Sequence, residues 1–266
     1  MTTSPFIDIN PNLRILGTAH VAAASVEAVK HHIAEYKPDI VAVELCKSRH
    51  DALTSDRRLD KEGLLKVVKE GKAPLVLIQS LLAAEQRKLG LDEGQQPGAE
   101  LIAAVEEAKA AGLEVALVDR DIQVTLRRAW KNMRFREKYR VLTSLLAQDD
   151  DDDEAPDINS LLDDSDLLSS LMEELRGFSP GAGIVLIDER DEYLATKISA
   201  LNPNKKVLAV VGAGHLAGIE NYLVNDKCDI NRIEELQTIP PKTVAMKVLP
   251  WAIPMLVMGL MAYYLS

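Results

Sequence analysis

Two short segments that combine glycine with histidine are the first candidates for chemistry in this sequence. Residues 17–20 (Gly-Thr-Ala-His) and 212–215 (Gly-Ala-Gly-His) each follow an apolar run, and their histidines, His20 and His215, are 195 positions apart. A third apolar run ends at Glu44. Imidazoles and carboxylates together are common ligands of divalent metal ions, which can activate a bound water molecule for hydrolysis. We therefore predict that His20, His215 and Glu44 bind manganese, zinc or cobalt.

Glu44 has two possible roles in such a site, and they exclude each other. As a metal ligand it would touch the ion, whereas as a general base it would stand one water molecule away and take a proton from that water. A structural interpretation competes with both, since a single histidine after a strand is more often a helix cap or a hydrogen-bonded core residue. The matching pair of segments favours the functional interpretation.

Charged residues elsewhere in the chain are predicted to assist. Arg49 lies five positions after Glu44, where it can orient that carboxylate or hold one from a substrate, and Arg49 or Arg190 can stabilise an oxyanion. Plainer explanations remain open: a surface salt bridge for Arg49, a solvated helix face for residues 189–191, and a strand exit with a helix N-cap for residues 119–121. Substrate-binding roles are predicted for Asp119, Arg120 and Asp191.

Four apolar runs must bring these residues together. Rich in Val, Ile and Leu and without polar alternation, they are typical of strands buried on both faces. Segments with a helical pattern separate them, which predicts an α/β fold with a mostly parallel central sheet and helices on both faces. The carboxyl ends of its strands would share one edge, where ligand sites gather in such sheets. The four predicted strands are residues 13–18, 39–45, 113–119 and 206–212.

Glycine before each histidine is expected to let the backbone turn sharply out of the strand without a Cβ clash. The positions concerned are Gly17 and Gly212. The other three histidines lack such a context and are predicted to lie on the surface: His31, His32 and His50.

The composition narrows the classes of protein and partner. The chain has 266 residues and a formal net charge of −10, and we see no basic stripe, which argues against a nucleic-acid partner.

Residues 121–200 hold no strand candidate and are predicted to be a helical insertion. Within it, an acidic loop at 149–157 begins with six consecutive acids, which repel one another and favour a solvated conformation. With two cysteines, a disulfide framework is excluded.

The C-terminal end has the composition of a membrane helix. Residues 248–266 are 19 uncharged residues, close to the roughly 20 that a bilayer-spanning helix needs, with Trp and Tyr near the ends. We therefore predict an α/β domain over residues 1–242 and a transmembrane segment over 243–266; the alternative is a buried core helix. Lys242 and Lys247, just before the uncharged residues 248–266, predict a membrane protein whose soluble domain is cytoplasmic.

Five ordered motifs resemble the TraB/PrgY family of pheromone-shutdown proteins, which is related to the Tiki and GumN proteins and shares a fold with EreA and ChaN proteins. They are "LGTAHVAAAS", "VAVELCKSRHDAL", "LVDRDIQVTLRRAW", "DERDEYLA" and "VVGAGHLAGI". The resemblance implies a membrane-attached, metal-dependent peptidase whose two histidines and glutamate would be His20, His215 and Glu44. Family members usually have several C-terminal membrane helices, whereas this chain has one candidate. The remaining family motifs contain Arg49, Asp119, Arg120, Arg190 and Asp191.

The sequence thus predicts a membrane-tethered metallohydrolase, a peptidase acting on a peptide or small protein signal. It is also compatible with assembly into a homo-oligomer. One alternative is a non-catalytic protein that sequesters a peptide or small ligand at the same edge of the sheet. Another is a structural scaffold held at the membrane.

Overall fold

The protein is described by a computed structural model, which places residues 4–18, 22–54, 99–146, 173 and 175–239. The predicted acidic loop, the predicted transmembrane segment and His20 lie outside these ranges. Within them, no helix is both long and apolar enough to cross a bilayer. The boundary predicted at residue 242 also falls outside the described residues, so the domain division stays a prediction.

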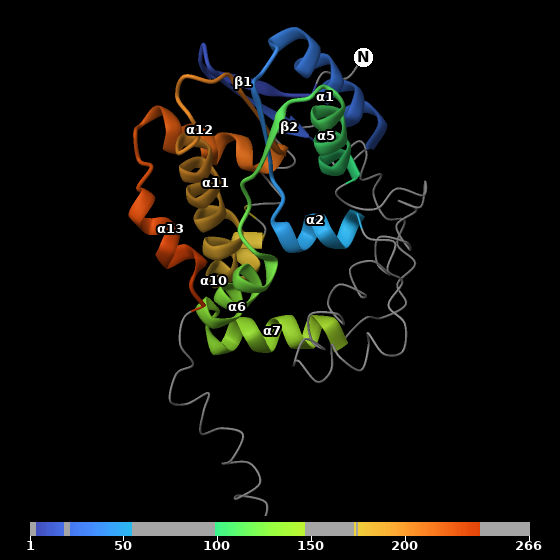
Figure 1. Cartoon of the computed structure of the whole chain (residues 1–266). Coiled ribbons are helices and arrows are strands. Elements are labelled where there is room, and N and C mark those ends of the chain that lie inside the picture. Colours follow the sequence, from blue (N-terminus) through green and yellow to red (C-terminus); the bar gives the residue numbers. More distant parts are fainter. Residues whose placement is uncertain (1–3, 19–21, 55–98, 147–172, 174, 240–266) are drawn as a thin grey trace, which may run out of the picture.

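A five-stranded sheet forms the centre of the fold (Figure 1). All four predicted strands are present, and one strand, β1, was not predicted. The prediction of a mostly parallel sheet needs correction because the sheet is mixed: β1 pairs antiparallel with β2, while the other neighbours are parallel. The strand order is β1-β2-β5-β3-β4. The strands are β1 (Phe6–Asn10), β2 (Leu13–Thr18), β3 (Ile40–Val43), β4 (Glu114–Leu117) and β5 (Val207–Gly212).

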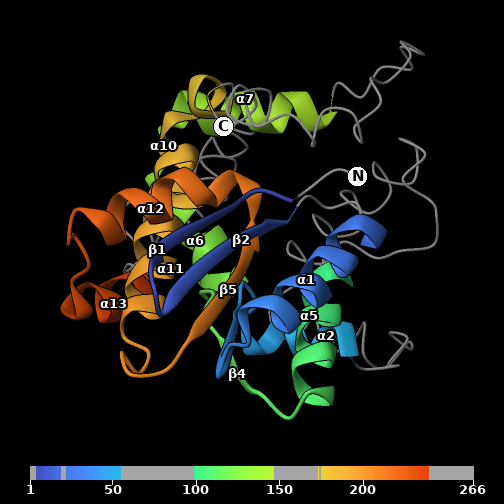
Figure 2. The ribbon, with the colours of Figure 1, turned by 90° about the horizontal axis from the view of Figure 1, so that it is seen from above.

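Helices cover both faces of the sheet, as predicted (Figure 2). On one side lie α1 and α5, and on the other α11 and α12. The helical elements of the described residues are α1 (Ala22–Tyr36), α2 (Lys47–Thr54), α5 (Ala99–Ala110), α6 (Ile122–Asn132), α7 (Phe135–Leu146), α10 (Pro180–Gly183), the π-helix η1 (Ile184–Asp188), α11 (Glu189–Ser199), the 3₁₀-helix η2 (Ala213–His215), α12 (Leu216–Val224) and α13 (Ile230–Gln237).

Continuous apolar strands supply two cores because alternate residues point to opposite faces. Along β5, Val207, Ala209 and Val211 pack towards α11 and α12, whereas Leu208 and Val210 pack towards α1 and α5. All five are buried. This two-sided burial explains why the strand sequences lack polar alternation.

Between β4 and β5 the described residues form helices, as the sequence predicted. Two of these helices begin at caps that are visible in the sequence: Asp121 accepts a hydrogen bond from the Gln123 amide at the start of α6, and Ser179 caps α10, where Pro180 is in the first turn. Helices α6, α7 and α10 lie together at the end of the molecule opposite β1 (Figure 1).

Candidate active site

The carboxyl ends of the central strands bring acidic and basic side chains to one edge of the sheet. Glu44 directly follows β3, Asp119 follows β4 by two positions, and His215 ends η2, which follows β5. The Glu44 amide donates to the carbonyl of Val210, so Glu44 continues the pairing of β3 with β5 for one more residue. The side chains of Glu44, Asp119 and His215 are 6–7% exposed. These three buried groups define the rim of the sheet.

Glu44 is held as a carboxylate by three neighbours. Its Oε1 accepts a hydrogen bond from Nη2 of Arg190 at 2.5 Å, and its Oε2 accepts one from the Gly212 amide at 2.6 Å. Burial alone would raise the pKa of Glu44, but the charges of Arg190 and His215 and the Gly212 amide outweigh it and lower that pKa to about 2. Glu44 is therefore charged at neutral pH despite its burial.

Arg190 bridges two of these carboxylates. It donates to Glu44 and, through Nη2 at 2.8 Å and Nε at 3.3 Å, to both oxygens of Asp119. Although burial opposes the charged form, the two carboxylates outweigh it and raise the pKa of Arg190. The structure thus brings together three predicted site residues that are up to 146 positions apart in sequence.

His215 is paired with Asp191. Its Nδ1 lies 2.6 Å from Oδ1 of Asp191, and its Nε2 lies 3.8 Å from Oε1 of Glu44. A carboxylate at Nδ1 holds that nitrogen protonated, so the free lone pair of a neutral imidazole is at Nε2, on the side of Glu44. Burial would lower the pKa of His215, but Glu44 and Asp191 raise it overall. Burial raises the pKa of Asp191 despite His215.

The glycines at this edge act differently from what was predicted. Gly212 has a φ of −60° and a ψ of 135°, which any residue can adopt, so it makes no special turn. At Gly17, an added Cβ would overlap with the side chain of Leu216. At Gly218, which was not predicted, it would overlap with the carboxylate of Asp191. Gly17 and Gly218 therefore allow close packing.

Two predicted assisting residues lie in different surroundings. Arg49, early in α2, is half-buried, and its charge contributes to the low pKa of Glu44. Arg120 is 1% exposed and lies away from the rim, where it donates to Thr125, Glu189 and two backbone carbonyls. The structure therefore does not bring Arg120 to the rim with the other predicted residues.

The buried ion pairs around Glu189 were missed by sequence reasoning. Arg120 donates to Glu189 at 2.8 Å, and Arg128 donates to both of its oxygens at 2.8 Å. The two arginines also donate to backbone carbonyls near the end of α13, including those of Leu236 and Thr238. The signal available in the sequence was a run of charges in α11 next to apolar residues, for which a solvated face was the plainer explanation beside the roles predicted for Arg190 and Asp191.

His32 was predicted to lie on the surface, and this was wrong. It is 6% exposed, and its Nδ1 lies 3.3 Å from Nη1 of Arg14. Arg14 also donates to both oxygens of Asp8 on β1. Since β1 itself was not predicted, the cluster that buries His32 could not be anticipated.

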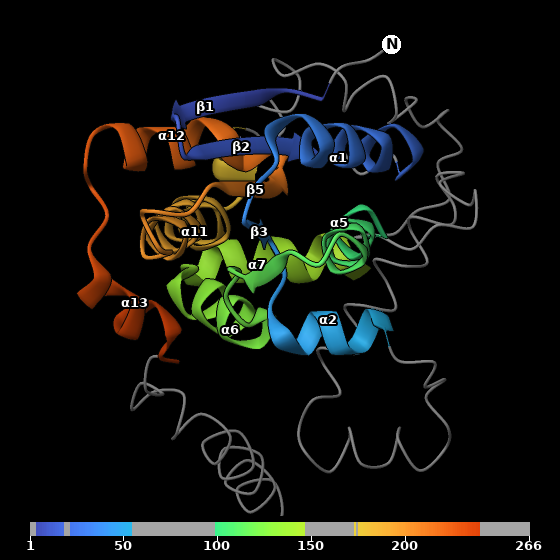
Figure 3. The same ribbon diagram turned by 45° about the horizontal axis from the view of Figure 1, so that its top comes forward.

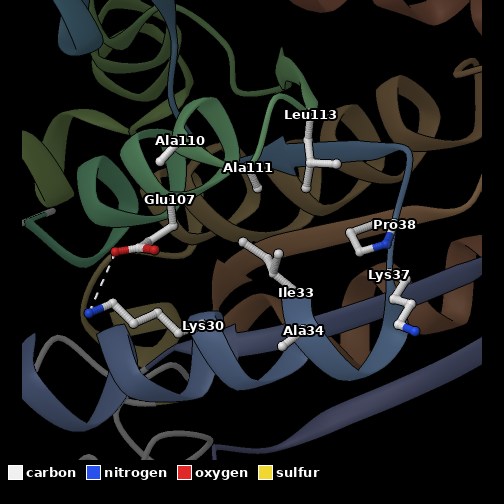
Figure 4. A pocket seen from close by; sticks show the side chains of 9 residues that line it. All are labelled: Lys30, Ile33, Ala34, Lys37, Pro38, Glu107, Ala110, Ala111 and Leu113. Carbon is white, nitrogen blue, oxygen red and sulfur yellow. Dashed lines mark ion pairs between the residues drawn. The ribbon is translucent and has the colours of Figure 1, made fainter.

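A hollow among the described residues lies remote from the rim. It has a volume of about 550 Å³ and lies between α1 and α5, near residues that precede β3 and β4 (Figure 4). Its lining includes Ile33, Pro38 and Leu113, with one ion pair between Lys30 and Glu107 at 3.5 Å. A hollow at the amino ends of the strands cannot hold a substrate against Glu44 and His215.

The rim fits a metal ion in part. Among the described residues, no three His, Cys, Asp or Glu side chains already form a metal-binding group. The gap of 3.8 Å between His215 Nε2 and Glu44 Oε1 is nevertheless short enough for one ion to reach both atoms with bonds of about 2.1 Å. The third predicted ligand, His20, follows β2, whose last residue Thr18 pairs with Gly212.

The fold and the rim define an α/β domain with paired imidazole and carboxylate groups at the carboxyl edge of its sheet. A sequence model of the TraB/PrgY/gumN family matches residues 9–228, which is most of the chain. The chain therefore belongs to the TraB/PrgY/gumN family, as its motifs predicted.

Relatives of the chain occur in archaea and mammals. It is 35% identical to an uncharacterized protein of Methanocaldococcus jannaschii over 95% of its own length and 64% of the relative's length. It is 32% identical to the TraB domain-containing protein of Homo sapiens, over 94% of this chain and 72% of the human protein, and 31% identical to the mouse protein of the same name. The chain thus spans about two thirds of the length of these relatives.

Proposed function

We propose that the protein is a membrane-tethered, metal-dependent hydrolase, namely a peptidase acting on peptide signals. The observation behind this proposal is the arrangement of His215. Its Nδ1 is held by Asp191 at 2.6 Å, while its Nε2 lies 3.8 Å from a Glu44 oxygen. A bound divalent ion would supply Lewis acidity and an activated water molecule.

The residues of the chain have distinct tasks in this proposal. Asp191 fixes the tautomer and ring orientation of His215, which leaves Nε2 free as a ligand. Glu44 is the second ligand, because its Oε1 is already close enough to share an ion with Nε2. Arg190 fixes the position of Glu44 and is itself held by Asp119. His20 is the predicted third ligand.

Arg49 is the better placed of the two arginines to assist a substrate. Arg190 donates to two carboxylates of the protein, and its charge is balanced there. Arg49 is half-buried and close enough to Glu44 to affect its pKa. We therefore assign oxyanion stabilisation or the binding of a substrate carboxylate to Arg49.

Membrane attachment in this proposal comes from the 19 uncharged residues at 248–266, with the domain on the cytoplasmic side. A non-catalytic role, in which the rim sequesters a peptide, is the alternative, because His, Glu and Arg side chains also bind peptide termini.

Metal content and turnover test the proposal together. The full chain would be loaded with manganese, zinc or cobalt, its bound metal measured by mass spectrometry, and its cleavage of a broad peptide library followed. We expect bound metal and cleavage in the wild type, weakened metal binding in Glu44→Gln and His215→Ala, and no change in His31→Ala, whose imidazole is exposed. Tight peptide binding without cleavage by any metal-loaded form would favour sequestration, and unchanged metal content in both variants would refute the metal site.

A further inference from the structure

The corner between α6 and α7 presents basic and aromatic side chains on one surface of an otherwise acidic protein. We propose that this surface docks onto an anionic lipid bilayer. Its five defining residues, called here the basic-aromatic face, are Trp130, Arg134, Phe135, Lys138 and Tyr139.

The aromatic rings of this face are unusually exposed. Phe135 is 84% exposed, Tyr139 64% and Trp130 40%. Phe135 and Tyr139 are four positions apart on α7, so they share one side of that helix. Lys138 Nζ lies 5.8 Å from the centre of the Trp130 ring, which makes the surface continuous from α7 to α6.

Positive charge accompanies these rings. Arg134 directly precedes α7, and its carbonyl accepts the Lys138 amide, so these two basic residues are one helical turn apart. Residues 127–140 contain seven Lys and Arg, of which Arg128 is buried in an ion pair with Glu189, and one acid, Glu137. Glu137 is buried, and its Oε2 accepts hydrogen bonds from Ser179 and the Gly181 amide. We expected no basic stripe from the sequence, but the net charge of −10 conceals this local one.

The end of α13 lies against α6, one of the two helices that form this corner. Nη1 of Arg128, on α6, donates to the Thr238 carbonyl at 3.1 Å, just after α13. Figure 3 shows α13 ending beside α6. Ile239, the last described residue, is 43% exposed. From this point nine residues of sequence lead to the uncharged segment 248–266, and nine residues span at most about 32 Å, so a membrane tether would begin within that distance of Ile239.

A bilayer suits this surface better than other anionic partners. Basic side chains are attracted to anionic headgroups, and Trp, Tyr and Phe side chains favour the interface between headgroups and acyl chains. An acidic peptide would pair with Arg134 and Lys138 but leave Phe135 in water. A nucleic acid could use both kinds of side chain, but it would not account for the neighbouring uncharged segment. The acidic remainder of the protein would be repelled by the membrane, so docking would fix the orientation of the domain.

This inference rests on the proposed function only in using the predicted membrane segment to orient the domain. The fluorescence of Trp130 tests docking of the basic-aromatic face separately from that segment. The chain has two tryptophans, Trp130 and Trp251. In a full chain carrying Trp251→Phe, Trp130 is the one remaining tryptophan, and excitation selective for tryptophan over the six tyrosines reports on it alone. Its emission and its quenching by acrylamide would be measured with phosphatidylcholine vesicles that contain increasing fractions of phosphatidylserine. We expect a blue shift and protection from acrylamide that grow with the phosphatidylserine fraction.

Matched variants identify the side chains responsible. Each basic group near an anionic membrane strengthens attraction about fivefold, so Arg134→Gln with Lys138→Gln should weaken the phosphatidylserine-dependent response by about 25-fold. Lys109→Gln with Lys227→Gln removes the same charge from exposed positions elsewhere and should leave the response unchanged. Phe135→Ser should reduce the protection of Trp130. Thermal unfolding followed by circular dichroism would show that the variants fold.

Three outcomes would overturn the inference. Trp130 could stay equally accessible at every phosphatidylserine fraction, or the control pair could weaken the response as much as the face pair. Alternatively, a single-stranded oligonucleotide could protect Trp130 while vesicles do not. Failure of the tether alone would give a different result. In a flotation assay the protein would then no longer float with neutral vesicles, while anionic vesicles would still shift the fluorescence emission of Trp130.

Discussion

Replacing Gly218 with alanine tests the geometry of the His215–Asp191 pair without touching either residue. Gly218 is inside α12, where alanine is normally favoured over glycine by about 1 kcal/mol. In this structure, however, the new Cβ would overlap with Oδ2 and Cγ of Asp191 and lie 2.9 Å from its Cβ. For this one substitution, helix propensity therefore predicts a gain in stability and packing predicts a loss.

The packing effect should prevail. Overpacking a close contact typically costs about 1 to 3 kcal/mol. If Asp191 moves away to relieve the overlap, a buried charge-assisted hydrogen bond to His215 is lost as well, which costs about 1.5 to 3 kcal/mol. Alanine's better helix propensity offsets about 1 kcal/mol of this cost, so we expect Gly218→Ala to lower the free energy of unfolding by about 1.5 to 5 kcal/mol.

Urea unfolding of both proteins measures this difference, and Gly177→Ala is its control. Gly177 is also helical, but a Cβ there would have no atom within 4 Å, so alanine should be neutral or stabilising. Asp191→Ala removes two of the three overlapping atoms, so Gly218→Ala should cost at least 1 kcal/mol less in that background than in the wild type. A Gly218→Ala protein as stable as the wild type would refute the close approach of α11 and α12 at this point.

Three further predictions concern the buried charges. Glu189→Gln leaves two buried arginines without their carboxylate and should cost about 3 to 5 kcal/mol in urea unfolding, whereas Glu114→Gln, in an exposed ion pair with Lys205, should change little. The folded-state pKa of Glu44 is lowered to about 2, so the ionised Glu44 side chain stabilises the fold above the ordinary pKa of 4.5, and this stabilisation is lost as the pH falls towards 2. Glu44→Gln should therefore flatten the dependence of the free energy of unfolding on pH between about 2 and 5. The pKa of His215 is raised in the folded state, so protonated His215 stabilises the fold fully below pH 6.5, and this stabilisation is lost as the pH rises through the folded-state pKa. His215→Asn should remove this loss of stability in unfolding curves measured from pH 6 upwards.

The sheet was predictable to the extent that burial marks the strands. The four parallel strands are continuous apolar runs because both of their faces are covered, and this pattern is local in the sequence. Strand β1 could not be found that way: Phe6–Asn10 lies at the edge, with alternating exposed and half-buried residues. Helix α13 has one buried residue, Leu236, and is eight residues long, which is too short for its apolar periodicity to identify a helix.

The rim was predictable where a residue follows directly from a strand end. Glu44 and His215 meet because parallel strands end at one edge, and this needs only topology. The direction of a side chain further beyond the strand end could not be predicted. Asp119 binds Arg190 at the rim, while the next residue, Arg120, points into the packed helices and binds Glu189. Adjacent residues beyond a strand differ in direction, and no property of the sequence "DRD" shows which one turns back to the sheet.

The charged cluster that opens α11 shows why side-chain partners could not be inferred from the sequence. Successive residues of an α-helix are about 100° apart, so Glu189, Arg190 and Asp191 point in three directions. Each finds a buried partner of opposite charge: Glu189 meets Arg120 and Arg128, Arg190 meets Glu44 and Asp119, and Asp191 meets His215. Those partners lie between 24 and 146 positions away. A local charge pattern is the same for a solvated helix face and for a buried one, and only the arrangement of distant segments decides between them. Because these three residues share one helical turn, a rotation of α11 would disturb all three contacts at once, so the buried pair with Glu189 helps to fix the direction of the two residues at the rim.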